Sequence, residues 1–298
     1  TADQRVSGRP VGSAGRVSLA TLGELLVDAA GRLTTVSDTP RLDAEVLLAA
    51  AIDRPRSHLY AWPEQIPEPA QTARFAAYLE RRLMGEPVAY LLGWREFWSL
   101  ELGVTPDTLI PRPETELLVE LVLARLPADR SLAIADLGTG SGAIALALAK
   151  ERPRAQIVAT DRSAATLAVA RDNAIRLHIA NVEFREGDWC TPLAGEHFDL
   201  IVSNPPYVAA TDSRWREGEL RFEPSGALVA GEDGLDAIRA IIIQAPDYLA
   251  PGGWLLLEHG YDQGETVPVL LRRRGFTEVT DHRDTAGVSR SSCGRWAG

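Results

Sequence analysis

The amino-acid sequence predicts an α/β fold: a mostly parallel, twisted sheet with helices on both faces, preceded by a small helical domain and a β-hairpin connector. Three observations support this prediction. From about residue 132 to residue 258, short apolar runs alternate with helical patterns, as in a parallel sheet with crossover helices. Residues 18–84 show helical periodicity. A chain of 298 residues with 45% apolar content is also long enough for two domains.

The N-terminal part is expected to be a tail followed by helices. Residues 1–16 are rich in Gly, Ser and Arg without apolar periodicity and begin without a Met, and we interpret them as a flexible or processed tail. Within residues 17–85, a first helix is expected with Ser18 as its cap, and a second begins at Thr39-Pro40. A third helix is expected over residues 68–84. These segments predict a helical domain that ends near Gly85.

Residues 86–110 are expected to form the connector. Apolar residues alternate there around Gly93 and Gly103, with Tyr90 and Leu91 in the first half, which is typical of short strands joined by turns. We therefore expect a β-hairpin between the two domains.

Residues 111–298 are expected to form the α/β domain. The predicted helices cover residues 114–126, 142–150, 164–177 and 236–249, and the predicted strands cover residues 132–137, 156–160, 182–186, 198–203 and 254–258. In open α/β sheets, ligands bind outside the carboxyl ends of the strands. The residues that follow these strands are therefore the candidates for a functional site.

The composition limits the functions that the chain can have. A net charge of −10 and a pI near 5.1 speak against a large surface for duplex nucleic acid, because such binding needs Lys and Arg to neutralise phosphates. Cys190, Cys293 and the five histidines lack the spacing of metal ligands, so we expect no metal. We find neither a secretion signal nor an apolar run of eighteen or so residues, which predicts a soluble protein of a reducing cytoplasm.

A glycine-rich turn follows the first predicted strand. Residues 136–142 read Asp-Leu-Gly-Thr-Gly-Ser-Gly, and their glycines would let a nucleotide-like ligand approach the backbone closely. The spacing differs from the G-x-G-x-x-G of dinucleotide-binding proteins, and no Gly-Lys-Ser/Thr follows. The alternative is a tight turn without a ligand. The candidate cofactor-binding residues here are Asp136, Gly138, Thr139, Gly140, Ser141 and Gly142.

Polar or aromatic residues also follow the second and third strands. Asp161 lies roughly twenty residues past the glycines, where an acid accepts hydrogen bonds from ribose hydroxyls. Its alternative role is to cap the helix that begins near Ala164. Asp188 can accept from the exocyclic amine of adenine, and Trp189 can cover the purine face or simply pack in the core. We therefore expect three strand ends to form an adenosine pocket.

Asn204, Pro205, Pro206 and Tyr207 follow the fourth strand. Proline has no N–H to donate, so strand pairing should end there in a rigid turn. The Asn204 side-chain oxygen and the Pro205 carbonyl can each accept a hydrogen from one planar NH2 group while Tyr207 stacks on it. Catalysis would then depend on alignment and charge stabilisation rather than on a neighbouring base. The turn alone leaves adenine and glutamine open as the owner of the NH2 group.

Residues 110–116, Ile-Pro-Arg-Pro-Glu-Thr-Glu, precede the first helix of the α/β domain. Two prolines around Arg112 can form a rigid lid, which makes Arg112 and Glu114 candidate substrate-binding residues. A simple helix start with proline in the first turn is the equal alternative.

In their order along the chain, these features resemble the Rossmann-like class I S-adenosylmethionine-dependent methyltransferases. The closer resemblance is to the N5-glutamine methyltransferases of peptide-chain release factors, the HemK or PrmC family. It extends over about residues 18–276 and is carried by the strings at residues 85–93, 95–98, 109–116, 232–235 and 260–264.

The resemblance implies S-adenosylmethionine as the cofactor, S-adenosylhomocysteine as its product, and a class I release factor as the protein substrate. The methyl acceptor would be the side-chain amide of the glutamine in the Gly-Gly-Gln loop of that factor. The glycine turn, Asp161, Trp189 and Asn204 would contact the cofactor, residues 204–207 would hold the glutamine, and the helical domain would dock the release factor. The family ends its sheet with an apolar strand, whereas residues 288–294 are polar, so we expect a short or irregular edge strand there.

Other functions are compatible with parts of this pattern. A DNA adenine-N6 methyltransferase would grip a flipped base with the same Asn-Pro-Pro-Tyr turn, although the acidic balance offers little phosphate-binding surface. A glutamine methyltransferase acting on a ribosomal protein fits the site equally well. The intact glycine turn and strand-end acids disfavour a catalytically silent binding module, and the glycine spacing disfavours an NAD-linked oxidoreductase.

Overall fold

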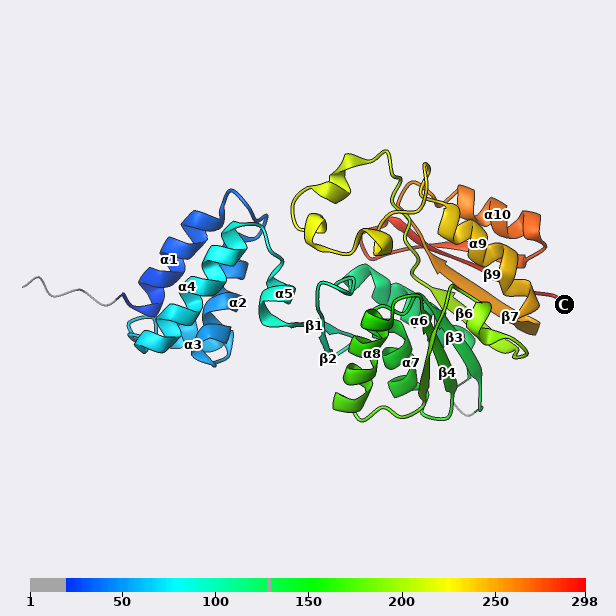
Figure 1. Ribbon diagram of the computed structural model, residues 1–298, viewed down its shortest axis with the longest axis horizontal. Helices are drawn as coiled ribbons and strands as arrows, with labels where there is room; N and C mark the ends of the chain where they lie inside the picture. The colour runs from blue at the N-terminus through cyan, green and yellow to red at the C-terminus, as the bar shows by residue number, and fades with distance from the viewer. Residues whose placement is uncertain (1–19, 128–129) are drawn as a thin grey trace, which may run out of the picture. The chain divides into compact units, whose positions relative to one another are not determined.

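The computed structural model describes residues 20–127 and 130–298, so the tail predicted over residues 1–16 lies outside the described residues. The chain divides into two compact units, the first ending at Met84 and the second beginning at Gly85 (Figure 1). Among the described residues, no helix has the length and the apolar composition needed to cross a membrane.

The first unit consists of helices α1 (Leu22–Leu33), α2 (Pro40–Ile52), α3 (Arg56–Ala61) and α4 (Pro69–Leu83). Thr21 caps α1: its hydroxyl accepts from the Glu24 N–H, and the Glu24 carboxylate accepts from the Thr21 N–H. The cap predicted at Ser18 was wrong, because only the Thr-x-x-Glu spacing satisfies both free N–H groups. The short helix α3 was not predicted. The buried core includes Leu22, Leu26, Leu47, Phe75 and Leu79.

The second unit begins with helix α5 (Val88–Leu92) and the hairpin of β1 (Trp94–Phe97) and β2 (Leu100–Gly103). Trp98 and Ser99 form its turn with φ values of 52° and 54°, as a two-residue turn with both φ positive requires. The predicted hairpin is present. Tyr90 and Leu91, which were expected in a strand, lie in α5.

A seven-stranded sheet forms the centre of the second unit, in the order β5-β4-β3-β6-β7-β9-β8. Strands β3 to β7 are parallel, and β9 is antiparallel to both of its neighbours. From β3 the chain adds β4 and β5 on one side, and it then adds β6 and β7 on the other side of β3. The topological switch point therefore lies between β3 and β6, where ligands bind in such sheets. The bounds are β3 (Ala133–Leu137), β4 (Gln156–Asp161), β5 (Val182–Glu186), β6 (Phe198–Ser203), β7 (Leu249–Glu258), β8 (Thr277–Arg283) and β9 (Ser289–Arg295).

Helices cover both faces of this sheet, because successive strand residues point to opposite sides. Ile134 packs in one core with the helices that follow the hairpin and the first strands, and its neighbour Ala135 packs in a second core with the later helices (Figure 1). The first group is α6 (Glu116–Arg125), α7 (Ala143–Glu151) and α8 (Ala164–Arg176), and the second is α9 (Asp236–Gln244) and α10 (Thr266–Arg274). The predicted α/β architecture is confirmed.

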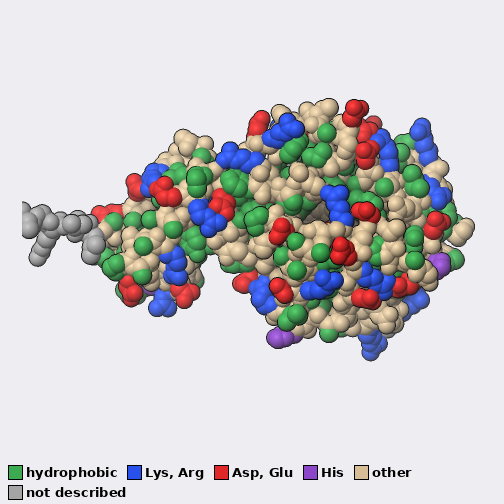
Figure 2. Space-filling view, in the orientation of Figure 1, with side chains coloured by type: hydrophobic (Ala, Val, Ile, Leu, Met, Phe, Trp, Pro, Cys, Tyr) green, Lys and Arg blue, Asp and Glu red, His purple; other side chains and the backbone are tan. Residues whose placement is uncertain are grey.

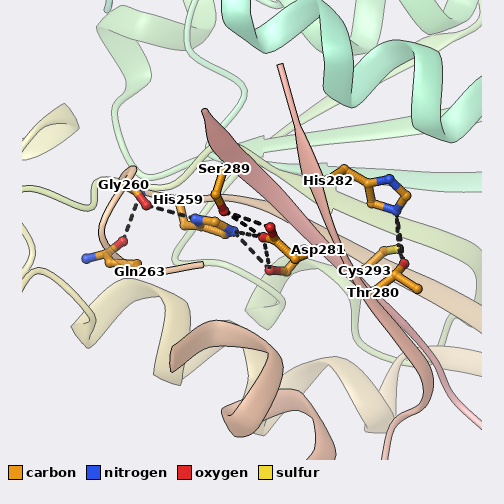
Figure 3. A network of polar contacts seen from close by, with 9 residues as sticks. His259, Gly260, Gln263, Thr280, Asp281, His282, Ser289 and Cys293 are labelled. Atoms are coloured by element: carbon orange, nitrogen blue, oxygen red, sulfur yellow. Dashed lines mark hydrogen bonds and ion pairs between the residues drawn. The ribbon is translucent and has the colours of Figure 1, made fainter. Parts of the chain in front are cut away.

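The polar segment predicted to be a short or irregular edge is a seven-residue strand inside the sheet. Strand β9 lies between β7 and β8 and pairs with both. Its Ser292 hydroxyl is 2.9 Å from Nε2 of the buried His259. Its Ser289 hydroxyl donates to Asp281 on β8 at 2.8 Å (Figure 3). These partners let small polar side chains be buried, so the prediction of a short edge strand was wrong, whereas the irregular register between β8 and β9 agrees with the expected irregularity.

Candidate active site

A cavity of about 660 Å³ opens at the carboxyl ends of β3, β4, β5 and β6. This is the size range of small-molecule binding sites. Residues from both sides of the switch point meet there, together with the connector residues Asp107 and Leu109 and the segment 224–231. The predicted site residues that line the cavity are Gly138, Gly140, Asp161, Asp188, Trp189, Asn204 and Pro206.

The glycine turn presents its backbone to this cavity. Gly140 has a φ of 59°, and a Cβ atom built there would meet no protein atom within 4 Å, so the backbone is open on that side. Its N–H donates to Asp161 Oδ2 at 3.1 Å, which ties the turn to the end of β4. Gly142 caps the N-terminus of α7. A ligand can therefore reach the main chain of this turn.

Asp136 braces the same turn from behind and does not line the cavity. Its Oδ2 accepts from the Thr139 hydroxyl at 2.6 Å and from the Ala145 N–H at 3.2 Å. Its Oδ1 is buried and has no hydrogen-bond partner among the described residues. Burial raises the pKa of Asp136 to about 7. Thr139 and Ser141 are buried as well and lie outside the cavity lining.

Asp161 lines the cavity at the end of β4. Its Oδ1 accepts from the Ser163 N–H at 3.0 Å, and burial raises its pKa. Helix α8 is capped by Ser163, whose side chain accepts from the Thr166 N–H at 3.2 Å. The alternative role of Asp161 as the cap of this helix was therefore wrong.

Asp188 and Trp189 lie just beyond β5. Asp188 is exposed on the cavity wall, whereas the Trp189 ring packs partly against the core under the sheet. The core-packing role of Trp189 is confirmed, and because Trp189 also lines the cavity, its contact with a purine stays a prediction.

The turn after β6 is held from several sides. The Asn204 Nδ2 donates to the Thr115 hydroxyl at 3.1 Å, and Pro206 lines the cavity next to Asn204. Pro205 and Tyr207 do not line it. The Tyr207 hydroxyl donates to Glu258 Oε1 at 3.3 Å, and burial raises the pKa of Tyr207 far above its usual value.

Two later residues fix the backbone of this turn. Gln263 Nε2 donates to the Tyr207 carbonyl at 3.1 Å, and its Oε1 accepts from the Gly260 N–H at 2.9 Å (Figure 3). A Cβ atom at Gly234 would lie 2.3 Å from the Tyr207 carbonyl oxygen, and Gly234 has a φ of 76°, so glycine is required there.

Arg112 and Glu114 lie outside the cavity lining. A 3-10 turn (Pro113–Thr115) leads directly into α6, as expected for a helix start with proline in its first turn. Arg112 forms an ion pair with Glu223, whose buried carboxylate also accepts from the Ile110 N–H at 3.0 Å. Glu223 thereby fastens the segment before α6 to the long segment that follows β6.

Three residues near the site were missed in the sequence: Thr115, Glu258 and Gln263. Glu258 ends β7 beside β6 and is only 2% exposed. A carboxylate at the end of a predicted strand was the signal that could have found it, by the same rule that identified Asp161. Among the described residues, no group of three His, Cys, Asp or Glu side chains could hold a metal ion.

The two parts of the cavity wall offer different chemistry. The glycine turn, Asp161 and Trp189 provide backbone groups, a carboxylate and an indole, which suit a nucleoside. Asn204 adds a carboxamide beside them, with its nitrogen already bonded to Thr115. The nucleoside-compatible residues and the Asn204 carboxamide thus line the same cavity.

Comparison with protein families gives two matches along the chain. Residues 24–93 match the PrmC N-terminal domain, and residues 114–219 match the methyltransferase small domain. A release factor glutamine methyltransferase of Pseudomonas aeruginosa is 54% identical over 88% of this chain and 94% of its own length. Proteins of the same name from Coxiella burnetii (52% identical, 89% and 95% covered) and Salmonella typhimurium (50% identical, 87% and 94% covered) are also similar.

Solved structures agree on the fold. A methyltransferase from Pyrococcus furiosus matches with a TM-score of 0.51 and 19% identity, over 75% of this chain and 99% of that one. The METTL16 methyltransferase domain matches with a TM-score of 0.52 and 16% identity, over 67% and 90% of the two chains.

Proposed function

The chain belongs to the release factor glutamine methyltransferases, and on this basis we propose that it methylates the side-chain amide nitrogen of a glutamine in a peptide-chain release factor. We place that glutamine in the Gly-Gly-Gln loop of class I release factors. Asn204 is the observation that supports this most directly: it lies on the cavity wall with its amide nitrogen bonded to Thr115.

S-adenosylmethionine, the cofactor of this methyltransferase, supplies an electrophilic methyl group when bound. The residues present fit it. The cavity has the volume of a small-molecule site, and the open backbone at Gly140 permits a close approach. Asp161 would accept from the ribose hydroxyls, Asp188 from the adenine amine, and Trp189 would cover the purine.

Asn204 and its turn would hold the glutamine. The Asn204 Oδ1 and the Pro205 carbonyl would accept the two hydrogens of the substrate NH2 group and orient the nitrogen toward the cofactor side of the cavity. Tyr207 would limit the position of the amide from a ring whose hydroxyl is fixed on Glu258. These residues act by alignment and by stabilising the positive charge that develops on the nitrogen.

The helical unit would dock the release factor. Its described surface includes the large apolar side chains of Trp62 and Ile66, which are 59% and 51% exposed. Exposed aromatic and aliphatic side chains are frequent anchors of protein interfaces. With a release factor as its substrate, we propose that the enzyme acts in the cytoplasm.

A DNA substrate is disfavoured. On the face drawn in Figure 2, acidic and basic side chains are interspersed over the larger unit. A surface of mixed sign does not provide the clustered Lys and Arg that bind duplex phosphates.

The test is the transfer of labelled methyl from S-adenosylmethionine to three acceptors: a purified class I release factor, the same factor with its loop Gln changed to Ala, and duplex DNA. We expect label on the unchanged factor alone. Label that persists after the Gln change, or that appears on DNA, would contradict the proposed substrate. A purified ribosomal protein serves as a further acceptor and separates the two kinds of protein substrate.

A further inference from the structure

A buried carboxylate lies beneath the turn that carries Asn204. The Oε1 atom of Glu258 accepts from the Tyr207 hydroxyl at 3.3 Å. Its Oε2 atom is buried and has no hydrogen-bond partner among the described residues. An unpaired oxygen of this kind is costly to bury, so the carboxylate needs a reason to be there.

Thr115 is the neighbour that connects this carboxylate to Asn204. The Thr115 side chain is buried, and its hydroxyl accepts from Asn204 Nδ2 at 3.1 Å. A hydroxyl that accepts in this way still has one proton to donate. Burial raises the pKa of Glu258 to about 7, and the nearby Thr115 and Tyr207 hydroxyls oppose this rise. The free Thr115 proton is therefore a donor available to Oε2, which has no partner in the described part of the chain.

The hydrogen-bond donors and acceptors of Glu258 and Thr115 determine which atom of the Asn204 amide faces Thr115 and which faces the cavity. A hydroxyl alone can either donate to the amide oxygen or accept from the amide nitrogen. An ionised carboxylate only accepts, so it attracts the Thr115 proton and leaves Thr115 a lone pair for Asn204 Nδ2. The Asn204 Oδ1 is then left for the cavity. A substrate NH2 group has only hydrogens to offer, and it needs an oxygen there.

We propose that Glu258 and Thr115 are positioning residues for methyl transfer, which together keep the Asn204 amide oxygen turned toward the substrate. The inference rests on the proposed function, because it assumes that Asn204 accepts a hydrogen bond from the substrate amide. Neither residue lines the cavity, so both act through Asn204 and Tyr207.

The charge on Glu258 controls this arrangement. The groups that face it are Thr115 and Glu114 before α6, Tyr207 after β6 and Arg290 on β9; Arg290 lowers its pKa and Glu114 raises it. Once protonated, Glu258 can donate to Thr115, Thr115 can donate to the Asn204 oxygen, and the amide turns its NH2 group toward the substrate. We expect kcat to fall as the pH drops through about 7. This acidic limb should be absent in Glu258→Gln.

The first experiment compares Thr115→Val, Thr115→Ser and Glu258→Gln in the full-length chain, with release factor as the acceptor. We expect Thr115→Val and Glu258→Gln each to lower kcat about tenfold to a hundredfold. This fall should not exceed the fall in kcat caused by removing a group that contacts the reacting atoms directly. Thr115→Ser, which keeps the hydroxyl, should stay within about threefold of the wild type. The Kd for S-adenosylmethionine should not change in any of them.

Thr108→Val is the matched control. Thr108 is also a buried threonine of the segment before α6, and its hydroxyl donates to the Thr105 carbonyl at 3.1 Å. The control should lose thermal stability without losing kcat. Unchanged kcat in Thr115→Val, or a loss explained wholly by a smaller folded fraction, would overturn the proposal.

Exchanging the donor at residue 204 for an acceptor tests whether Glu258 orients the Asn204 amide or only supports the local structure. Asn204→Asp places an acceptor where Asn204 Nδ2 now donates, so it conflicts with Glu258 across Thr115. Adding Glu258→Gln frees the Thr115 proton for the new carboxylate. We expect Glu258→Gln to lower activity when Asn204 is present and to raise it about threefold to tenfold in the Asn204→Asp background. A decrease in both backgrounds would overturn the directional role.

Methyl transfer by the wild type to the release factor distinguishes a failure of the positioning role from a failure of the proposed function. If the wild type methylates the factor and the Thr115 and Glu258 variants match it, only the positioning role fails. If the wild type transfers no methyl to the factor, the proposed function fails, and the positioning role fails with it.

Discussion

The Asn204 side chain donates through its nitrogen to Thr115, and Asn204 lines the cavity. Its removal should therefore affect turnover more than cofactor binding. We expect Asn204→Ala to lower kcat about a hundredfold or more, because the substrate amide loses its oriented acceptor. Binding of S-adenosylmethionine should be less affected, since Asp161 and the glycine turn are untouched. Turnover with labelled cofactor and calorimetric titration of the cofactor measure the two effects. An equal loss of both would make Asn204 chiefly a cofactor ligand.

Asp136 predicts a pH dependence of stability. A carboxyl group whose pKa is raised to about 7 on folding binds its proton more tightly in the folded chain than in the unfolded one. Its contribution to stability is therefore fully present below its ordinary pKa of 3.8 and is lost as the pH rises through about 7. Asn at this position can still accept from Thr139 and Ala145, and it does not ionise.

We therefore expect Asp136→Asn to gain free energy of unfolding relative to the wild type at pH 8 and to gain less, or nothing, at pH 5. Urea unfolding at the two pH values measures this difference. Cofactor affinity should be retained, because Asp136 does not line the cavity. Loss of cofactor binding in Asp136→Asn would instead support the cofactor contact predicted from the sequence.

The strand-end rule identified one half of the site better than the other. Gly140, Asp161, Trp189 and Asn204 follow apolar runs, and they meet at one cavity because parallel strands end at one edge. The partners that orient Asn204 come from distant parts of the chain. Thr115 lies 89 residues before Asn204, and no local pattern announces a hydrogen bond between them.

At the scale of single elements, two adjacent serines of β9 test whether its buried polar side chains stabilise the fold through their hydrogen bonds. The Ser292 hydroxyl bonds to His259, whereas the buried Ser291 hydroxyl has no partner among the described residues. We expect Ser292→Ala to cost about 1–2 kcal/mol of stability. Ser291→Ala should be neutral or stabilising, because it removes an unsatisfied polar atom. Urea unfolding compares the two, and an equal cost would contradict the role of the Ser292 network.

The elements differ in how far local sequence determines them. Strand β3 and helix α2 have the apolar periodicity or the proline start that predicts them directly. Strand β9 has neither, because its burial depends on His259 and on Asp281, whose positions are set by β7 and β8. Helix α3 has only six residues, which is too short for a helical period to be evident.

At the scale of the whole molecule, the helical unit is expected to determine affinity for the release factor, and the second unit to determine chemistry. Replacing Trp62 and Ile66 together with Ser should raise KM for the factor about tenfold, because exposed apolar anchors of this kind contribute much of an interface. The kcat and the affinity for S-adenosylmethionine should stay the same.

Ile175→Ser provides the control for this change, since Ile175 on α8 is 72% exposed but lies in the other unit. Steady-state methylation at varied release factor concentration measures KM for both variants. If the control raises KM as much as the double substitution, the helical unit is not the docking surface.

The position of β9 has a consequence for synthesis on the ribosome. Residues 289–295 follow β8 along the chain but pair between β7 and β8, so β7 keeps an unpaired edge until they have emerged from the exit tunnel. Exposed strand edges invite pairing with other chains. The helical unit can fold while the nascent chain is still growing. The seven-stranded sheet can be completed only after residues 289–295 have been synthesised. Truncated or stalled chains that lack this segment keep the β7 edge unpaired and are therefore prone to aggregate.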